Sequence, residues 1–287
     1  MTLSRSDVLR LLEDNAISPS RALGQNFVAD PNTVRRVARL AAVGPGDRAL
    51  EVGAGLGSLT LALAEAGASV LALERDRWLV PVLRKVLAER APLPAPVEVI
   101  EADAMAADWS RLLVPPTGWV LVSNLPYNVA TPLIADLLDD VPAVERMFVM
   151  VQREVALRLA ARPGDRAYGA VSVKVAYWAE ATLAGTVPAS VFVPRPKVGS
   201  ALVEIRRRQA PAVDPLVVSP AVLFRLVRTG FAQRRKMLRR ALAGLDVPAG
   251  AFVEAGIDET ARAEQLSVQD WGRLAAAFAA RSGPPRE

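Results

Sequence analysis

Short apolar segments alternate with longer amphipathic segments through the first two thirds of the chain. Apolar segments of four to six residues, bounded by turn signals, are typical of strands buried on both faces of a sheet. Strands are expected at 48–52, 69–73, 97–100, 119–122 and 146–151, with later strands at 171–178 and 200–206. Helices are expected at 4–14, 30–44, 57–66, 76–90, 131–138 and 154–161. This alternation predicts an α/β fold, in which helices cover both faces of a parallel sheet.

The last third of the chain has a different pattern. Residues 209–219 are rich in Pro and Val and are expected to form a linker. Apolar residues then recur at helical spacing over 221–243, 249–255 and 268–280. We therefore predict two domains, an α/β domain over residues 1–207 and a small all-α domain over 208–287.

Composition excludes several kinds of chemistry. The 287 residues include neither Cys nor His, so disulfides, zinc–thiolate sites and Ser-His-Asp triads are excluded. The acids Asp136, Asp139 and Asp140 are interpreted as solvated, and no metal site is expected. The five tryptophans are expected in the core. No apolar run reaches the roughly 18 residues of a membrane helix, so a soluble cytoplasmic protein without a membrane partner is expected.

Positive charge is concentrated near the C-terminus. Residues 206–287 contain 14 Lys and Arg against 8 Asp and Glu, a net charge of +6, whereas residues 1–205 contain 21 against 22, a net charge of −1. Arg234, Arg235, Lys236 and Arg239 belong to the densest stretch. A basic domain beside a near-neutral one indicates a polyanionic partner such as a nucleic acid, although a solvated basic helix surface is the plain alternative.

A glycine loop follows the first predicted strand of the sheet, at Glu51-Val52-Gly53-Ala54-Gly55-Leu56-Gly57. Ligands of open α/β sheets bind at this kind of strand–helix turn. Glu74 ends the next strand and is placed to accept hydrogen bonds from ribose hydroxyls. The dinucleotide fingerprint would need a glycine where Ser58 stands. The loop therefore favours S-adenosylmethionine (SAM) over NAD, and a plain tight turn remains open.

Two further polar segments follow the next strands. Asp103 comes after the third strand and could accept the amino group of a cofactor adenine. Asn124-Leu125-Pro126-Tyr127 comes after the fourth. The Asn124 side-chain oxygen and the Leu125 carbonyl could accept both N–H bonds of an exocyclic amine, and Tyr127 offers a ring for base stacking. Methyl transfer to such an amine needs no histidine. An ordinary Asn-Pro turn with a core Tyr is the alternative.

The order of these motifs resembles that of the rRNA adenine N6,N6-dimethyltransferase family, and it is most similar to the KsgA-type (RsmA) enzymes. Further matching segments are Gln25–Asp30, Gln152–Val155, Tyr168–Val173, Val191–Val198, Phe231–Lys236 and Gly256–Ser267, and the resemblance spans residues 18–280. It implies a Rossmann-like class I methyltransferase domain followed by an rRNA-binding helical domain. Ala54 and Val28 stand where many relatives have Pro and Leu, and neither departure puts the activity in doubt.

The resemblance also implies the roles of individual residues. SAM contacts fall on Asn26, Val28 (through its main chain), Gly53, Glu74, Asp103 and Asn124. The catalytic adenine site falls on Asn124, Leu125 and Tyr127, with Phe192 expected to sandwich the target base opposite Tyr127. Arg234, Arg235, Lys236 and Arg239 are expected to contact rRNA phosphates.

The activity implied is SAM-dependent dimethylation at N6 of two adjacent adenosines in the 3′-terminal hairpin of 16S rRNA. The implied partner is that rRNA within a small ribosomal subunit or its precursor, and the enzyme is expected to be a monomer. Three alternatives remain. They are a 23S rRNA methyltransferase of the erythromycin-resistance type, an assembly factor that keeps the fold without essential catalysis, and an NAD-linked oxidoreductase.

Overall fold

The computed structural model describes residues 2–20 and 22–282, and the chain divides into two compact units. The first unit comprises Met1–Ala156 and Thr182–Arg206, and the second comprises Leu157–Ala181 and Arg207–Glu287. One division point, between Arg206 and Arg207, lies next to the expected end of the α/β domain at residue 207, whereas the segment 157–181, which was expected in that domain, falls in the second unit.

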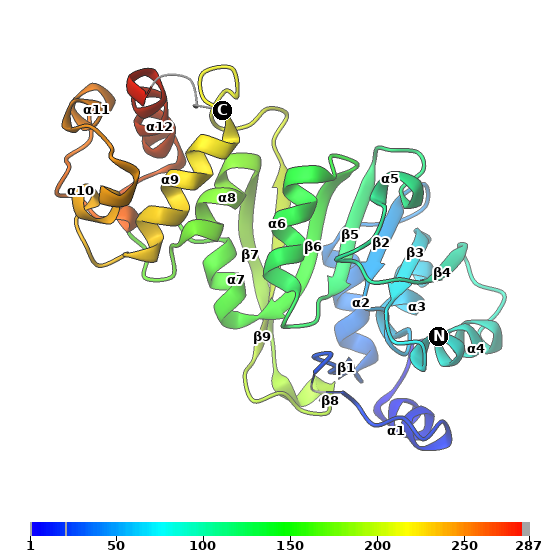
Figure 1. The fold of residues 1–287 in the computed structure, drawn as a ribbon. Helices are drawn as coiled ribbons and strands as arrows, with labels where there is room; N and C mark the ends of the chain where they lie inside the picture. The colour runs from blue at the N-terminus through cyan, green and yellow to red at the C-terminus, as the bar shows by residue number, and fades with distance from the viewer. Residues whose placement is uncertain (1, 21, 283–287) are drawn as a thin grey trace. The chain divides into compact units, whose positions relative to one another are not determined.

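A seven-stranded sheet, counted over the described residues, has the order β4-β3-β2-β5-β6-β9-β7, and most of its residues belong to the first unit (Figure 1). Its strands are β2 (Arg48–Val52), β3 (Ser69–Glu74), β4 (Val97–Glu101), β5 (Trp119–Asn124), β6 (Val144–Gln152), β7 (Ala179–Val187) and β9 (Ser200–Arg207). Neighbours from β4 through β6 pair in parallel, and β9 pairs antiparallel with β6. The parallel strands therefore end at the same edge as the one where β9 begins.

The expected α/β alternation is confirmed in this unit. Its helices are α1 (Arg5–Asp14), α2 (Pro31–Leu40), α3 (Ser58–Glu65), α4 (Leu79–Glu89), α5 (Trp109–Leu112) and α6 (Ala130–Asp140), and α7 (Arg153–Leu159) leads into the second unit. Asp30 caps α2, with Pro31 as its first residue, as the sequence predicts. Asp76 does not cap α4, which begins three residues later than expected. The Asp76 carboxylate instead accepts the backbone N–H of Trp78.

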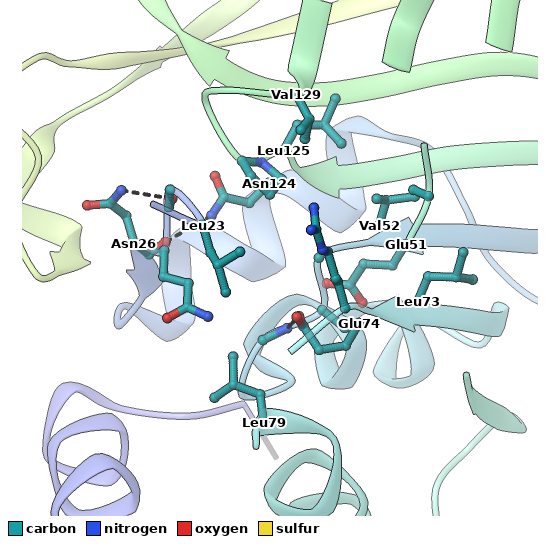
Figure 2. A pocket seen from close by; sticks show the side chains of 18 of the residues that line it. Leu23, Asn26, Glu51, Val52, Leu73, Glu74, Leu79, Asn124, Leu125 and Val129 are labelled. Carbon is teal, nitrogen blue, oxygen red and sulfur yellow. Dashed lines mark hydrogen bonds between the residues drawn. The ribbon is translucent and has the colours of Figure 1, made fainter. Parts of the chain in front are cut away.

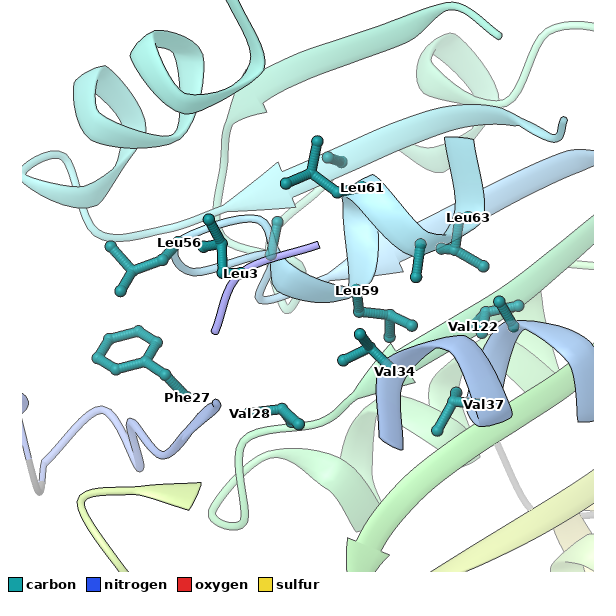
Figure 3. Close-up of a cluster of buried hydrophobic side chains, with 14 of the residues drawn as sticks. Leu3, Phe27, Val28, Val34, Val37, Leu56, Leu59, Leu61, Leu63 and Val122 are labelled. Carbon is teal, nitrogen blue, oxygen red and sulfur yellow. The ribbon is translucent and has the colours of Figure 1, made fainter. Parts of the chain in front are cut away.

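Apolar side chains of α2 and α3 pack with those of the sheet into one core (Figure 3). Val34 and Val37 of α2 and Leu59 and Leu63 of α3 are each at most 4% exposed. A two-stranded sheet of β1 (Phe27–Val28) and β8 (Phe192–Val193) adds to this core. The 3₁₀ helix η1 (Ala189–Val191) directly precedes β8. This small sheet and β7 were not predicted from the sequence.

The second unit is helical and has a separate core. Its helices are α8 (Ala170–Trp178), α9 (Pro220–Ala232), α10 (Leu238–Ala241), α11 (Ala249–Ala255) and α12 (Val268–Ser282), with 3₁₀ helices η2 (Ala243–Leu245) and η3 (Ala263–Gln265). No helix or strand lies within residues 209–219. The expectation of a linker is nevertheless wrong, because this segment lies inside the second unit and its Val218 is buried in the core of that unit. Within the described part of the chain, no helix is long and apolar enough to cross a membrane.

The prediction of a strand at 171–178 is wrong, because this segment forms α8. Val173 and Tyr177 lie four residues apart on one helix face, are fully buried, and join the core of the second unit. The ring of Tyr177 meets that of Phe224 at 5.2 Å. An unbroken apolar run does not distinguish a buried strand from a buried helix. This packing also explains why 157–181 belongs to the second unit.

Two other expectations need correction. The helix predicted over 221–243 is interrupted between Ala232 and Leu238. The tryptophans are not all in the core, because Trp78 is 67% exposed and lies 4.9 Å from the Arg77 guanidinium, whereas Trp271 is fully buried.

Candidate active site

A cleft opens at the carboxyl ends of β2, β3, β4 and β5, and its sides come from segments far apart in the sequence (Figure 2). It encloses about 1040 Å³, including space open to solvent. The predicted cofactor and adenine residues that line it are Asn26, Val28, Gly53, Glu74, Asp103, Asn124, Leu125 and Tyr127. The fold therefore gathers these residues into one cavity.

The glycine loop forms the floor of the cleft in a left-handed backbone conformation. Gly53 has φ +76° and its N–H donates to the Leu73 carbonyl at 2.8 Å. A Cβ on Gly53 would lie 3.2 Å from the ring of Pro126. Only glycine adopts this conformation readily and permits so close a contact. The glycine loop is thereby packed directly against the Asn-Leu-Pro-Tyr turn.

Glu74 ties the loop to the end of β3. Its carboxylate accepts the N–H of Gly55 at 2.7 Å and that of Asp76 at 2.9 Å. The side chain is 7% exposed, and this burial raises the pKa of its carboxyl group. A carboxylate oxygen accepts about two hydrogen bonds, so each oxygen retains capacity for a ligand hydroxyl.

Glu51 is a buried acid on the same cleft that was not among the predicted site residues. It is 2% exposed, and Thr60 Oγ1 donates to its Oε2 at 2.6 Å. Desolvation raises the pKa of Glu51 to about 8, so that at neutral pH its neutral form predominates. Its place before Gly53 was visible in the sequence, but burial and protonation state were not.

The Asn124 amide has a defined orientation. Its Nδ2 donates to the backbone carbonyl of Asn26 at 3.1 Å, so its oxygen is the atom that can accept from a substrate. The next residue is fixed as well, because Leu125 N–H donates to the Met150 carbonyl of β6 at 3.1 Å. Figure 2 shows Asn124 and Leu125 at one side of the cleft and Glu74 at another.

Tyr127 lies half-buried on the cleft. Its hydroxyl is 3.0 Å from Ser200 Oγ at the start of β9, and burial raises the pKa of the phenol. Asp103 lies on the rim, where its Oδ1 accepts the N–H of Met105 at 3.0 Å. Its Oδ2 is 3.1 Å from Nη1 of Arg75. Arg75 also lines the cleft. It was not predicted, because no motif spacing marks an arginine that follows Glu74 as a site residue.

Phe192 is placed differently from the expectation. It pairs with Val28 across the small β1–β8 sheet, is fully buried in the core, and does not line the cleft. The prediction that it faces Tyr127 across the cleft is therefore not met in this structure. The backbone pairing of β8 turns the ring into the core, and the sequence motif alone does not reveal this pairing.

The basic stretch of the second unit contains two kinds of cation. Arg234 pairs with Glu264 at 2.6 Å and donates to the Arg166 carbonyl at 2.8 Å, and Arg239 pairs with Glu259 at 2.7 Å. Arg235 and Lys236 are exposed in the turn that follows α9. The structure thus gives Arg234 and Arg239 carboxylate partners within their own unit.

Comparison with known proteins agrees with this geometry. The model of the family described as ribosomal RNA adenine dimethylase matches residues 18–280. The chain is 48% identical over 278 residues to a ribosomal RNA small subunit methyltransferase A of Thermobifida fusca, covering 95% of each chain. Residues 18–280 include every predicted cofactor and adenine residue, so the match covers the whole cleft.

Two solved structures have a similar fold. The 23S rRNA methyltransferase ErmE has a TM-score of 0.66 and 26% identity, over 88% of this chain and 99% of that one. A dimethyladenosine transferase from Plasmodium falciparum has a TM-score of 0.70 and 23% identity, over 85% and 94%. The fold is that of the class I SAM-dependent methyltransferases. The chain belongs to the ribosomal RNA adenine dimethylase family and is a SAM-dependent rRNA adenine methyltransferase.

Proposed function

We propose that the protein dimethylates N6 of two adjacent adenosines in the 3′-terminal hairpin of 16S rRNA during small-subunit biogenesis. The observation that carries this proposal is the pair of acceptors, Asn124 Oδ1 and the Leu125 carbonyl, beside the glycine-loop cleft. The small-subunit relative that is 48% identical supports 16S rather than 23S rRNA, since the identity to ErmE is 26%.

The groups around the cleft suit SAM in their chemistry. Glu74 offers acceptors for ribose hydroxyls, Asp103 offers one for the adenine amine, and Gly53 lets a ligand approach the backbone. Asn26, the main chain of Val28 and Asn124 complete the set that we assign to the cofactor. When bound, SAM supplies a methyl group on a sulfonium, which is transferred to the substrate amine.

The chain's own residues prepare the target amine. Acceptance of its two N–H bonds by Asn124 and Leu125 favours a tetrahedral nitrogen and frees the lone pair, which is otherwise delocalised into the ring. Pro126 keeps the turn rigid, and the ring of Tyr127 stacks on the flipped base. The proton leaves to water after transfer, so no strong base is required. Positioning and fixed dipoles supply the rate enhancement.

The second unit supports rRNA binding by its charge. It contains 17 Lys and Arg against 10 Asp and Glu, a net charge of +7. Arg235 and Lys236 are the cations that we assign to phosphate contacts, because Arg234 and Arg239 are already engaged by Glu264 and Glu259. We assign the enzyme as a monomer that acts on the small subunit or its precursor, and therefore to the cytoplasm.

Methyl transfer to defined ribosomal particles tests this proposal. Purified protein is incubated with labelled SAM and either small or large subunits that lack adenine dimethylation, and the labelled nucleotides are mapped. We expect four methyl groups on two adjacent adenines of 16S rRNA. Label in 23S rRNA would instead establish the erythromycin-resistance type of activity. SAM binding without transfer to either particle would favour an assembly factor.

A further inference from the structure

The hydroxyl of Tyr127 is held by a residue 73 positions later in the sequence. Tyr127 Oη and Ser200 Oγ lie 3.0 Å apart, and either atom can be the donor. Ser200 is 1% exposed, so its hydroxyl depends on partners within the protein. The resemblance of the chain to its family assigned no role to Ser200.

The sheet explains how these two residues meet. Leu125, two residues before Tyr127, is hydrogen-bonded to Met150 of β6. Ser200 begins β9 and pairs with Gln152, the last residue of the same strand β6. The neighbouring Gly199 carbonyl accepts the N–H of Arg153 at 3.0 Å. Both ends of the Tyr127–Ser200 bond are therefore positioned by one rigid strand.

We propose that Ser200 is a positioning residue for methyl transfer, which fixes the Tyr127 ring at the angle where a stacked adenine presents its amine to Asn124 and Leu125. This inference rests on the proposed function, because it assumes that Tyr127 stacks on the target base. A phenol with a single anchored hydroxyl has little freedom to tilt about its side-chain bonds. Ser200 acts through Tyr127 and does not itself touch the substrate.

The second methyl transfer depends most on this alignment. A monomethylated amine has one N–H bond fewer to donate to Asn124 and Leu125, so the stacking ring bears more of the orientation. A tilted ring should therefore impair the second transfer more than the first. Loss of the Ser200 hydroxyl is expected to leave more monomethylated adenosine in the rRNA. A general loss of stability would not cause this change of product.

The test uses Ser200→Ala, Tyr127→Phe and the double variant in the full chain, with small subunits that lack the modification and saturating SAM. We expect each single variant to lower the single-turnover rate about fivefold, as for the loss of one hydrogen bond, and the double variant to be no slower than either. At matched total methyl incorporation, 16S rRNA treated with any of the three variants should contain more N6-monomethyladenosine than rRNA treated with the wild type. The affinity for SAM should be unchanged.

Ser172→Ala is the matched control, since Ser172 is also 1% exposed and its hydroxyl donates to the Arg158 carbonyl within the second unit. It should retain the wild-type rate and product ratio. Tyr127→Phe keeps the test valid if Ser200→Ala fails to fold, because that change removes the same bond at a half-buried side chain. Wild-type behaviour of Tyr127→Phe, losses that multiply in the double variant, or an unchanged product ratio would overturn the proposal. Full activity of Tyr127→Ala is a different result, which would refute the stacking site itself.

Discussion

At the scale of single residues, the site depends on backbone partners distant in sequence. The orientation of the Asn124 amide is set by the carbonyl of Asn26, and the carboxylate of Glu74 accepts the backbone N–H of Gly55 in the glycine loop. The types and order of these residues could be read from the sequence. Their partners could not, because each partner lies on another segment that only the folded sheet brings close. The same holds for Phe192, whose burial follows from its pairing with β1.

Asn124→Ala removes the side-chain acceptor while the Leu125 carbonyl remains. We expect the rate of methyl transfer to fall by about a hundredfold or more, by analogy with the loss of one preorganised polar group in other active sites. Circular dichroism and thermal unfolding should show an intact fold. Asn15→Ala is the matched control, because its amide donates to Leu11 on the surface of the first unit. Wild-type activity of Asn124→Ala would refute the assignment of the adenine site.

The buried carboxyl group of Glu51 should make the free energy of unfolding depend on pH. Burial raises its pKa from 4.5 to about 8 in the folded state, so its neutral form favours folding. This contribution is fully present below about pH 4.5 and is lost as the pH rises through 8. The chain has no histidine, so few other groups titrate in this window. In urea unfolding between pH 5 and 9, Glu51→Gln should flatten the decline in stability.

Glu89→Gln serves as the comparison for this measurement, since Glu89 is exposed at the end of α4. It should leave the pH dependence of unfolding as in the wild type. A decline that is equally steep in Glu51→Gln would contradict a protonated Glu51 in the folded protein.

At the scale of helices and strands, hydrophobic pattern predicted most of the first unit. All five parallel strands lie where the apolar segments indicate. Strands β2, β3, β5 and β6 are mostly buried, as is typical of a sheet covered on both faces, whereas the edge strand β4 has no buried residue. The pattern failed at α8, which is buried on enough of its surface to lack helical periodicity. It also missed the two-residue strands β1 and β8, which are too short to carry any pattern.

Gly53→Ala tests the coupling between the glycine loop and the Asn-Leu-Pro-Tyr turn. The substitution places a Cβ at φ +76° and 3.2 Å from Pro126, so we expect a loss of about 1–2 kcal/mol of stability. It should also weaken SAM binding about tenfold or more, measured by calorimetry. Gly244→Ala is the control, since no atom lies within 4 Å of the added Cβ. Unchanged SAM affinity in Gly53→Ala would contradict a cofactor site on this loop.

At the scale of the whole molecule, the two units divide the chemistry. The first unit contains the cleft and has a net charge of −2 (18 Lys and Arg against 20 Asp and Glu), and the second has +7. The sequence predicted this asymmetry correctly, since charge can be counted without a structure. It did not predict which arginines are engaged by carboxylates, because Glu264 and Glu259 lie 30 and 20 residues away from their partners.

Neutralising Arg235 and Lys236 together should weaken binding to 16S rRNA and reduce the slope of log K against log salt concentration by about 1.5 to 2. Filter binding at several salt concentrations measures this slope. Arg111→Ala, which removes an exposed cation of the first unit, should leave the slope unchanged. An identical slope in the double variant and the wild type would show that Arg235 and Lys236 do not contact phosphates.

The most direct test of the account is a crystal structure of the protein with S-adenosylhomocysteine and adenosine monophosphate. We predict that the cofactor product lies between the glycine loop and Asp103, with its ribose at Glu74. The adenine of the nucleotide should stack on Tyr127, with N6 within hydrogen-bond distance of Asn124 Oδ1 and the Leu125 carbonyl. A nucleotide bound with N6 facing away from these two oxygens, or a cofactor bound outside the cleft, would contradict it.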